Sequence, residues 1–180
     1  MRYLHKIKSL RFYILHTRHH FAHLLIGLAF AWFLREWWNE FSLKYLILAL
    51  IGSEIIDVDH LLYIFVYGRH EWYAIEVKKF LRAGQLRDVW AFLSTNHKHN
   101  TALATHNVYF IGFFLVLSLV SFQYDWKASL VIFGAIVLHL LFDIADDLWV
   151  GKTIDILATI WLGGIKEPNA ILVAPANVIY

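Results

Sequence analysis

Long apolar runs dominate the sequence and set the first constraint on its fold. Four of them are long enough to cross a lipid bilayer, which takes about 20 residues. They are Phe21–Trp38, Leu43–Tyr67, Asn107–Gln123 and Lys127–Trp149. Hydrophobic residues make up 59% of the 180 positions, well above the share usual in soluble domains. The sequence therefore predicts an all-α, polytopic membrane helix bundle of about four transmembrane helices, built as a single domain over residues 1–180.

The segments outside these runs are polar. Residues 1–20 are basic and amphipathic, which is typical of a helix lying on a membrane surface. Residues 68–100 contain the helical patterns AIEVKKFLRAG and LRDVWAFLS. The apolar stretch Ile154–Ile165 is too short to span and is expected to be interfacial or re-entrant. A nucleic-acid-binding arm is the alternative interpretation of the basic N-terminus, but the alternation of apolar and charged residues there disfavours it.

The placement of lysine and arginine predicts the orientation. Thirteen of these residues lie in the N-terminal segment, in residues 68–100 and in the C-terminal tail, whereas Arg35, Lys44 and Lys127 are the three in the opposite connections. Cytoplasmic loops carry the excess of positive charge. Both termini and the 68–100 loop are therefore expected on the cytoplasmic side of the inner membrane, with membrane lipids as the first partners.

Histidine and acidic residues gather at one depth of this predicted bundle. Asp57 and His60 are spaced i, i+3 with Glu54 three residues before them, and His139 and Asp143 are spaced i, i+4. Each charge inside a span costs about 2.5–3.5 kcal/mol, which a bound cation would offset. The predicted metal ligands are His23, Asp57, His60, His106, His139 and Asp143. The chain has no cysteine, and nitrogen and oxygen ligands without sulfur favour Zn²⁺, Mn²⁺ or Fe²⁺.

Several neighbouring residues of the same types have open roles. Asp59 points away from Asp57 on a regular helix, so the two converge only if the helix breaks or if two metals bridge them. Six others fit either metal ligation or an ordinary surface or interfacial position: His19, His20, His97, His99, Asp146 and Asp147.

The order of the motifs resembles that of the YdjM-like membrane-bound metal-dependent hydrolases. The motifs are H-x-x-x-G (His23 to Gly27), D-x-D-H (Asp57 to His60), T-H (Thr105–His106) and H-x-x-x-D (His139 to Asp143). That family is thought to be distantly similar to zinc-dependent phospholipase C and to the fungal single-strand nucleases, whose helical folds hold a cluster of zinc ions. The resemblance implies the same six metal ligands, and it makes Asp59 a further ligand or a catalytic base.

Two positions depart from the family pattern. Ile56 precedes D-x-D-H, where family members commonly have proline, and Thr101–Ala102 stand where they tend to have His-Arg. Lys98 could replace the charge of that arginine, but not its bidentate binding to phosphate.

Together these features predict a metal-dependent hydrolase that acts at the cytoplasmic face on a phosphoester or lipid headgroup. The cofactor is expected to be zinc, with manganese or iron as alternatives, and Asp59 or Glu54 would accept the proton of metal-bound water. One alternative is a non-catalytic metal- or proton-binding protein, although FIGFFLVLSLV and ASLVIFGAIV place almost no polar residue in the far leaflet. The other is a structural subunit of a larger membrane complex or oligomer, in which the histidines fix helix packing or ligate haem. No nucleic-acid partner is expected.

Overall fold

The computed structural model describes residues 10–96 and 103–149, without the side chains of residues 10–19, 94, 95, 147 and 149. These described residues form helices and no strand, which confirms the all-α prediction for this part of the chain. Residues 97–102 and 150–180 are outside it, and so are the predicted stretch Ile154–Ile165 and the first part of the predicted surface segment 1–20.

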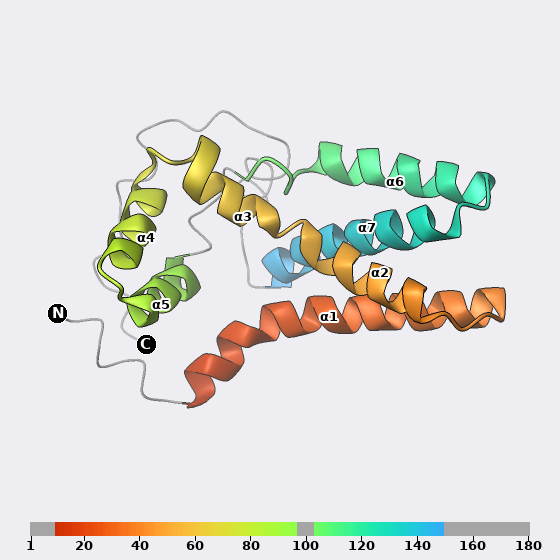
Figure 1. The fold of residues 1–180 in the computed structure, drawn as a ribbon, viewed down its shortest axis with the longest axis horizontal. Helices are drawn as coiled ribbons and strands as arrows, with labels where there is room; N and C mark the ends of the chain where they lie inside the picture. The colour runs from red at the N-terminus through yellow and green to blue at the C-terminus, as the bar shows by residue number, and fades with distance from the viewer. Residues whose placement is uncertain (1–9, 97–102, 150–180) are drawn as a thin grey trace.

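Four elements run along the long axis of the molecule (Figure 1). They are α1 (Leu10–Trp38), α2 (Leu43–Ile55), α6 (Val108–Gln123) and α7 (Lys127–Trp149). Helix α7 packs against each of the other three, and α1 also packs against α2. Helices α4 (Trp72–Arg82) and α5 (Leu86–Asn96) form a hairpin at the end where α1 begins and α7 ends.

Short polar signals set the ends of these helices. Asn107 caps α6, because its side-chain oxygen accepts hydrogen bonds from the backbone N–H groups of Tyr109 (3.0 Å) and Phe110 (3.1 Å). Asn39 after α1 and Asp125 between α6 and α7 adopt positive φ angles of 49° and 53°. Asn and Asp tolerate this left-handed conformation better than other non-glycine residues, so each allows a sharp reversal of the chain.

The predicted helix over Leu43–Tyr67 is interrupted after α2. It continues as α3 (Val58–Leu62) and then as the π-helical turn η2 (Tyr63–Tyr67). Near the interruption, backbone N–H groups bond to carbonyls three residues back, as for Asp57 to Glu54 (3.1 Å) and His60 to Asp57 (3.0 Å). In such a tightened backbone, side chains three residues apart eclipse one another. Glu54, Asp57 and His60 therefore lie on one face.

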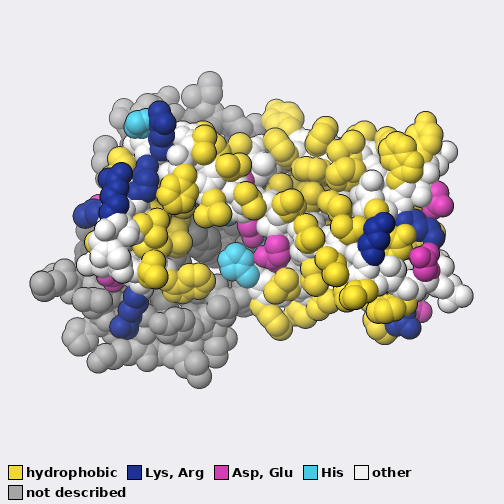
Figure 2. Space-filling model, viewed as in Figure 1, with side chains coloured by type: hydrophobic (Ala, Val, Ile, Leu, Met, Phe, Trp, Pro, Cys, Tyr) yellow, Lys and Arg dark blue, Asp and Glu magenta, His cyan; other side chains and the backbone are white. Residues whose placement is uncertain are grey.

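The long helices expose many apolar side chains and bury several polar ones among hydrophobic residues. The exposed side chains of α1, α2 and α6 are largely hydrophobic, for example Trp32 (61% exposed) and Leu119 (59%). Figure 2 shows apolar side chains covering the middle of the molecule, with lysine and arginine towards its two ends. The buried polar or charged residues of the described part are His23, Ser53, Asp59, His106, Ser121, His139 and Asp143. They lie among buried hydrophobic residues such as Leu140, while the exterior exposes more large apolar side chains than is usual for a water-soluble protein.

By length and composition, one helix of the described residues could cross a membrane. It is the Lys127–Asp146 part of α7, with a mean hydropathy of 2.2. Helix α6 is apolar but has only 16 residues, and the break after α2 divides the Leu43–Tyr67 run into pieces of 13, 5 and 5 residues. The first helix begins at Leu10, ahead of the predicted boundary at Phe21. The predicted number of about four spans is therefore not confirmed by the helices as they stand.

Two glycines allow the helices to approach closely. A Cβ atom on Gly52 would lie 2.8 Å from the carbonyl oxygen of Ile132 and 2.9 Å from the Cβ of Ala135, both on α7. A Cβ atom on Gly27 of α1 would lie 2.8 Å from Ser53 Oγ on α2. Small residues at helix crossings are how apolar helices bring their backbones together. Gly27 and Gly52 thus bring α1, α2 and α7 together beside Ser53.

A larger residue at Gly52 should loosen this crossing. In Gly52→Val, α2 would have to move away from the α7 backbone, and such overpacking costs about 1–3 kcal/mol of unfolding free energy. Gly112→Ala on α6 is the matched control, because a Cβ atom there meets nothing within 4 Å. Thermal unfolding followed by circular dichroism should show a lower midpoint for Gly52→Val and no loss for Gly112→Ala. Equal midpoints would contradict the role given to Gly52.

Candidate metal centre

Four ligand atoms from three segments of the chain converge inside the bundle. They are Asp57 Oδ1, at the break between α2 and α3, His106 Nε2, just before α6, and His139 Nε2 and Asp143 Oδ2, both on α7. His139 Nε2 lies 3.1 Å from Asp143 Oδ2 and 3.6 Å from Asp57 Oδ1. His106 Nε2 lies 3.5 Å and 3.7 Å from the same two oxygens. We call Asp57, His106, His139 and Asp143 the buried cluster.

The spacing within the buried cluster suits coordination of a metal ion. Hydrogen bonds from N–H to oxygen are most often about 2.9–3.0 Å long. Two ligands that each lie about 2.1 Å from a tetrahedral ion are about 3.4 Å apart. The four nitrogen-to-oxygen distances of the cluster, 3.1–3.7 Å, lie around the second value. The ligand atoms of Asp57, His106 and His139 all lie within 4.8 Å of one another, as ligands of a single cation would, and Asp143 contacts both histidines.

The backbone sets which nitrogen of His139 faces the cluster. Its Nδ1 lies within hydrogen-bond distance of the Ser53 carbonyl oxygen. A carbonyl oxygen can only accept, so Nδ1 carries a hydrogen, and in the neutral imidazole Nε2 is then the atom with the lone pair. This is the usual way in which a metal-binding histidine is oriented by a second hydrogen bond. Since Nε2 has a single lone pair, His139 can coordinate only one ion.

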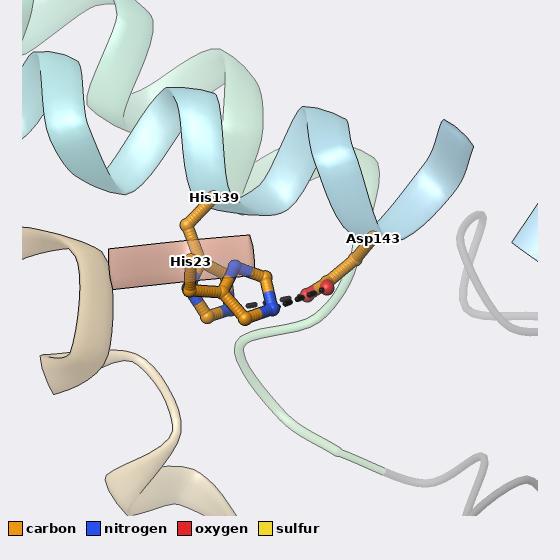
Figure 3. A group of neighbouring side chains, drawn as sticks. All are labelled: His23, His139 and Asp143. Atoms are coloured by element: carbon orange, nitrogen blue, oxygen red, sulfur yellow. Dashed lines mark ion pairs between the residues drawn. The ribbon is translucent and has the colours of Figure 1, made fainter. Parts of the chain in front are cut away.

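His23 of α1 lies against the cluster and contacts the same carboxylate. Its ring stacks on that of His139, with 3.7 Å between ring centroids, and its Nε2 lies 3.2 Å from Asp143 Oδ1 (Figure 3). The two oxygens of Asp143 are thereby divided, with Oδ1 towards His23 and Oδ2 towards His139 and His106. His23 can therefore orient Asp143 or bind a cation itself.

His60 lies on the more open side of the cluster. Its Nε2 is 3.7 Å from Asp57 Oδ1, and its side chain is 36% exposed, compared with 0% for His139 and 9% for His106. The structure thus brings all six predicted ligands together around Asp57 and Asp143.

Two cluster atoms have no hydrogen-bond partner in the described part of the chain. They are His139 Nε2 and Asp57 Oδ2, and both are buried from solvent. Buried polar atoms are nearly always hydrogen-bonded, so such exceptions mark a functional or ligand-binding group. His139 Nε2 lies 3.1 Å from Asp143 Oδ2, and Asp57 Oδ2 lies 3.6 Å from His20 Nδ1, which are distances that a bridging cation would satisfy.

Asp59, predicted as a ligand or catalytic base, has another environment. Its Oδ1 accepts a hydrogen bond from the Tyr67 hydroxyl (2.6 Å), and its Oδ2 accepts from the backbone N–H (2.8 Å) and the hydroxyl (2.9 Å) of Thr105. The nearest cluster nitrogen, His106 Nδ1, is 4.0 Å away. Asp59 is therefore held in a clamp, defined here as Asp59, Tyr67 and Thr105, which fixes the segment that carries His106.

Glu54, predicted as the other catalytic residue, lies at the edge of the site. Its side chain is 34% exposed, and its Oε2 is 3.8 Å from His20 Nδ1. His20, whose role the sequence left open, also lies 3.6 Å from Asp57 Oδ2. Of the other open residues, Asp146 is half-buried in α7, while His97, His99 and the side chains of His19 and Asp147 lie outside the described residues.

Three further residues contribute to the site and were not predicted from the sequence. Ser53 acts through its carbonyl oxygen, which any residue type has, so its identity carries no signal. Tyr67 is eight residues from Asp59 and meets it only because the π-helical turn η2 rotates the helix between them. The hydroxyl of Thr105 could have been found from its place in the T-H motif.

The clamp on Asp59 should control both stability and the position of His106. Asp59→Ala leaves the donors of Tyr67 and Thr105 without their acceptor, and each lost hydrogen bond to a charged group costs about 1.5–3 kcal/mol. Tyr67→Phe removes one of these bonds and should cost correspondingly less. Denaturant unfolding of both variants measures the two losses. An Asp59→Ala variant as stable as the parent protein would contradict the clamp.

Comparisons with family models, with curated proteins and with solved structures gave no match to this chain.

Proposed function

We propose that this protein is a membrane-embedded, metal-dependent hydrolase whose buried cluster binds a divalent cation. The observation that carries the proposal is the convergence of two imidazole nitrogens and two carboxylate oxygens at 3.1–3.7 Å inside an apolar bundle. Two carboxylates supply the charge that balances a divalent ion, and the set of ligands suits zinc, manganese or iron. The resemblance of the motifs to YdjM-like hydrolases agrees with this proposal.

The apolar exterior supports the membrane part of the proposal. We place α1, the α2–α3–η2 segment, α6 and α7 across the bilayer. The break after α2 makes that segment's pieces short, but together they run from Leu43 to Tyr67, which is long enough to span. At the far end, Lys127 pairs with Glu40 (2.8 Å) and lies over the Trp38 ring, as expected of residues at a membrane interface.

The metal, when bound, would lower the pKa of a coordinated water and polarise the ester oxygen. The residues of the chain set its surroundings. His139 is oriented by the Ser53 carbonyl, His106 by the Asp59 clamp, and Asp143 by His23. Access is from the side of Asp57 and His60, since their side chains are 14% and 36% exposed while that of His139 is buried.

The proposed substrate is a phosphoester, such as a lipid headgroup, at the cytoplasmic face. Helix α4 and its flanks lie at the same end as the start of α1 and present basic side chains, among them Lys78, Lys79 and Arg82. Basic groups beside a bilayer attract anionic headgroups, at about 1 kcal/mol per residue near the surface. In the proposed orientation this end of the bundle lies at the membrane surface, where both water and a lipid headgroup would reach the site.

A metal or proton carrier fits the described residues less well. A carrier needs polar groups through the whole membrane thickness. The core at the far end consists of Leu34, Ala49 and Val131, and the buried polar residue of that half, within the described ranges, is Ser121. The buried polar residues of the described part are therefore gathered mainly at one end, as a hydrolase at one membrane surface requires.

Metal content and turnover should depend together on the buried cluster. We expect purified protein to bind zinc, manganese or iron, and to hydrolyse one member of a panel of phospholipids and phosphodiesters. His139→Ala removes the imidazole that lies closest to Asp143, at 3.1 Å, so the variant should lose the buried ion. Turnover should fall about 100-fold or more, because even changes to residues that support a metal ligand cost about 10–100-fold. Glu36→Gln, on the exposed surface of α1 at the other end, is the control.

Elemental analysis and product detection by mass spectrometry measure the two quantities. A folded parent protein that takes up no added metal would contradict the proposed site. Bound metal with turnover equal in the parent and in His139→Ala would contradict the proposed catalysis.

The proposed orientation can be tested by labelling, because the chain has no cysteine. Gln85→Cys lies between α4 and α5, and Gln123→Cys ends α6 at the opposite end of the bundle. In intact spheroplasts an impermeant maleimide should label Gln123→Cys, and it should label Gln85→Cys only after the membrane is opened. Release of the protein from membranes by alkaline carbonate, or the reverse pattern of labelling, would contradict the proposed topology.

A further inference from the structure

We propose that His20, Glu54 and Asp57 hold a second divalent cation, and that the Asp57 carboxylate bridges it to the ion of the buried cluster. We call these three residues the outer group. The inference rests on the proposed function, because it takes the buried cluster as the first of the two sites. It adds a second site, in which Asp57 keeps its predicted role as a ligand, whereas His20 had an open role and Glu54 was predicted as a catalytic residue.

The two oxygens of Asp57 face different partners. Its Oδ1 lies 3.6 Å from His139 Nε2 and 3.7 Å from His106 Nε2, both in the buried cluster. Its Oδ2 lies 3.6 Å from His20 Nδ1, which is itself 3.8 Å from Glu54 Oε2. The distances of 3.6 Å and 3.8 Å in the outer group are longer than hydrogen bonds. They are close to the spacing of two ligands around one ion. One carboxylate thus joins two sets of ligand atoms.

The backbone explains this division. The tightened turn at the end of α2 places Glu54 and Asp57 on one face, three residues apart. His20 and His23 are likewise three residues apart on α1, so both face the same neighbouring helices. His23, nearer the middle of the bundle, reaches Asp143, and His20, one turn earlier, reaches Asp57 and Glu54.

The outer group contains acceptors that the described protein leaves unsatisfied. Glu54 Oε1 and Asp57 Oδ2 are both buried from solvent and have no hydrogen-bond partner within the described residues. Two adjacent carboxylates repel each other and resist sharing one site unless a positive charge lies between them. A divalent cation would supply that charge and occupy both acceptors, with His20 as a third ligand.

A second ion would give the site the open positions that catalysis needs. A zinc ion with four protein ligands is closed, whereas catalytic zinc keeps a position for water or substrate. The buried cluster already offers four ligands, and the outer group offers three in more exposed surroundings, with His20 53% and Glu54 34% exposed. Paired ions about 3.5–4 Å apart clamp the attacking and leaving oxygens of a phosphoester. The geometry therefore points to a phosphoester bound across both ions, with Glu54 as a ligand in place of the predicted general base.

Manganese provides a direct test, because two Mn²⁺ ions bridged by a carboxylate are magnetically coupled. We expect the detergent-purified full chain to bind two Mn²⁺ ions per protein and to give the electron paramagnetic resonance spectrum of a coupled pair. Glu54→Gln and His20→Ala should each bind one ion and give the spectrum of isolated Mn²⁺. Glu36→Gln, an equivalent change on the exposed far end of α1, should keep the coupled pair.

Three results would overturn the second site. In the first, the parent protein binds one ion, which Glu54→Gln keeps and His139→Ala loses. This result would leave the proposed function unaffected. The second is a coupled pair that survives in both outer-group variants. The third is loss of both ions in a folded Glu54→Gln, which would make Glu54 part of the first site. A parent protein that binds no ion would overturn the proposed function as well.

Discussion

The burial of two carboxylates among apolar helices is the constraint on which the rest of this structure depends. Asp57 and Asp143 lie on the inner side of a bundle whose exterior is largely hydrophobic. Five imidazoles lie within 4 Å of one or the other carboxylate, those of His20, His23, His60, His106 and His139. An uncompensated charge in such surroundings is costly, whatever the exact dielectric constant. Neutral imidazoles alone do not balance two negative charges, whereas a divalent cation does, and it uses the lone pairs that the imidazoles direct inward.

The helix packing serves this arrangement. Gly27 lets α1 approach α2 closely, and Gly52 lets α2 approach α7, so that ligand residues on all three elements can meet. The glycine of the H-x-x-x-G motif thereby has a physical role, because it lies one turn beyond His23 and faces Ser53, whose carbonyl orients His139. The close helix packing allowed by the small residues therefore also sets the positions of the polar atoms.

Most of the helices could be predicted from apolar periodicity, and α7 has the predicted bounds because its pattern is uninterrupted. The convergence of the six predicted ligands also followed from their spacing and from one shared depth. The break after α2 could not be foreseen, since Ile56 is compatible with a continuous helix. The environment of Asp59 depends on that break and on η2, because together they direct its carboxylate to Tyr67 and Thr105. Local patterns do not specify such rotations, which arise from tertiary packing.

The same break separates two tasks that a continuous helix would have combined. Asp59 faces the segment before His106 and fixes it, while Asp57, two residues earlier, faces the histidines. On a regular helix these carboxylates would diverge without either being placed against a partner helix. Here one positions a ligand and the other is a ligand, and the second oxygen of Asp57 remains directed towards His20 and the open edge of the site. A single D-x-D-H segment thus reaches both the inside of the proposed metal centre and its open edge, where His20 and Glu54 lie.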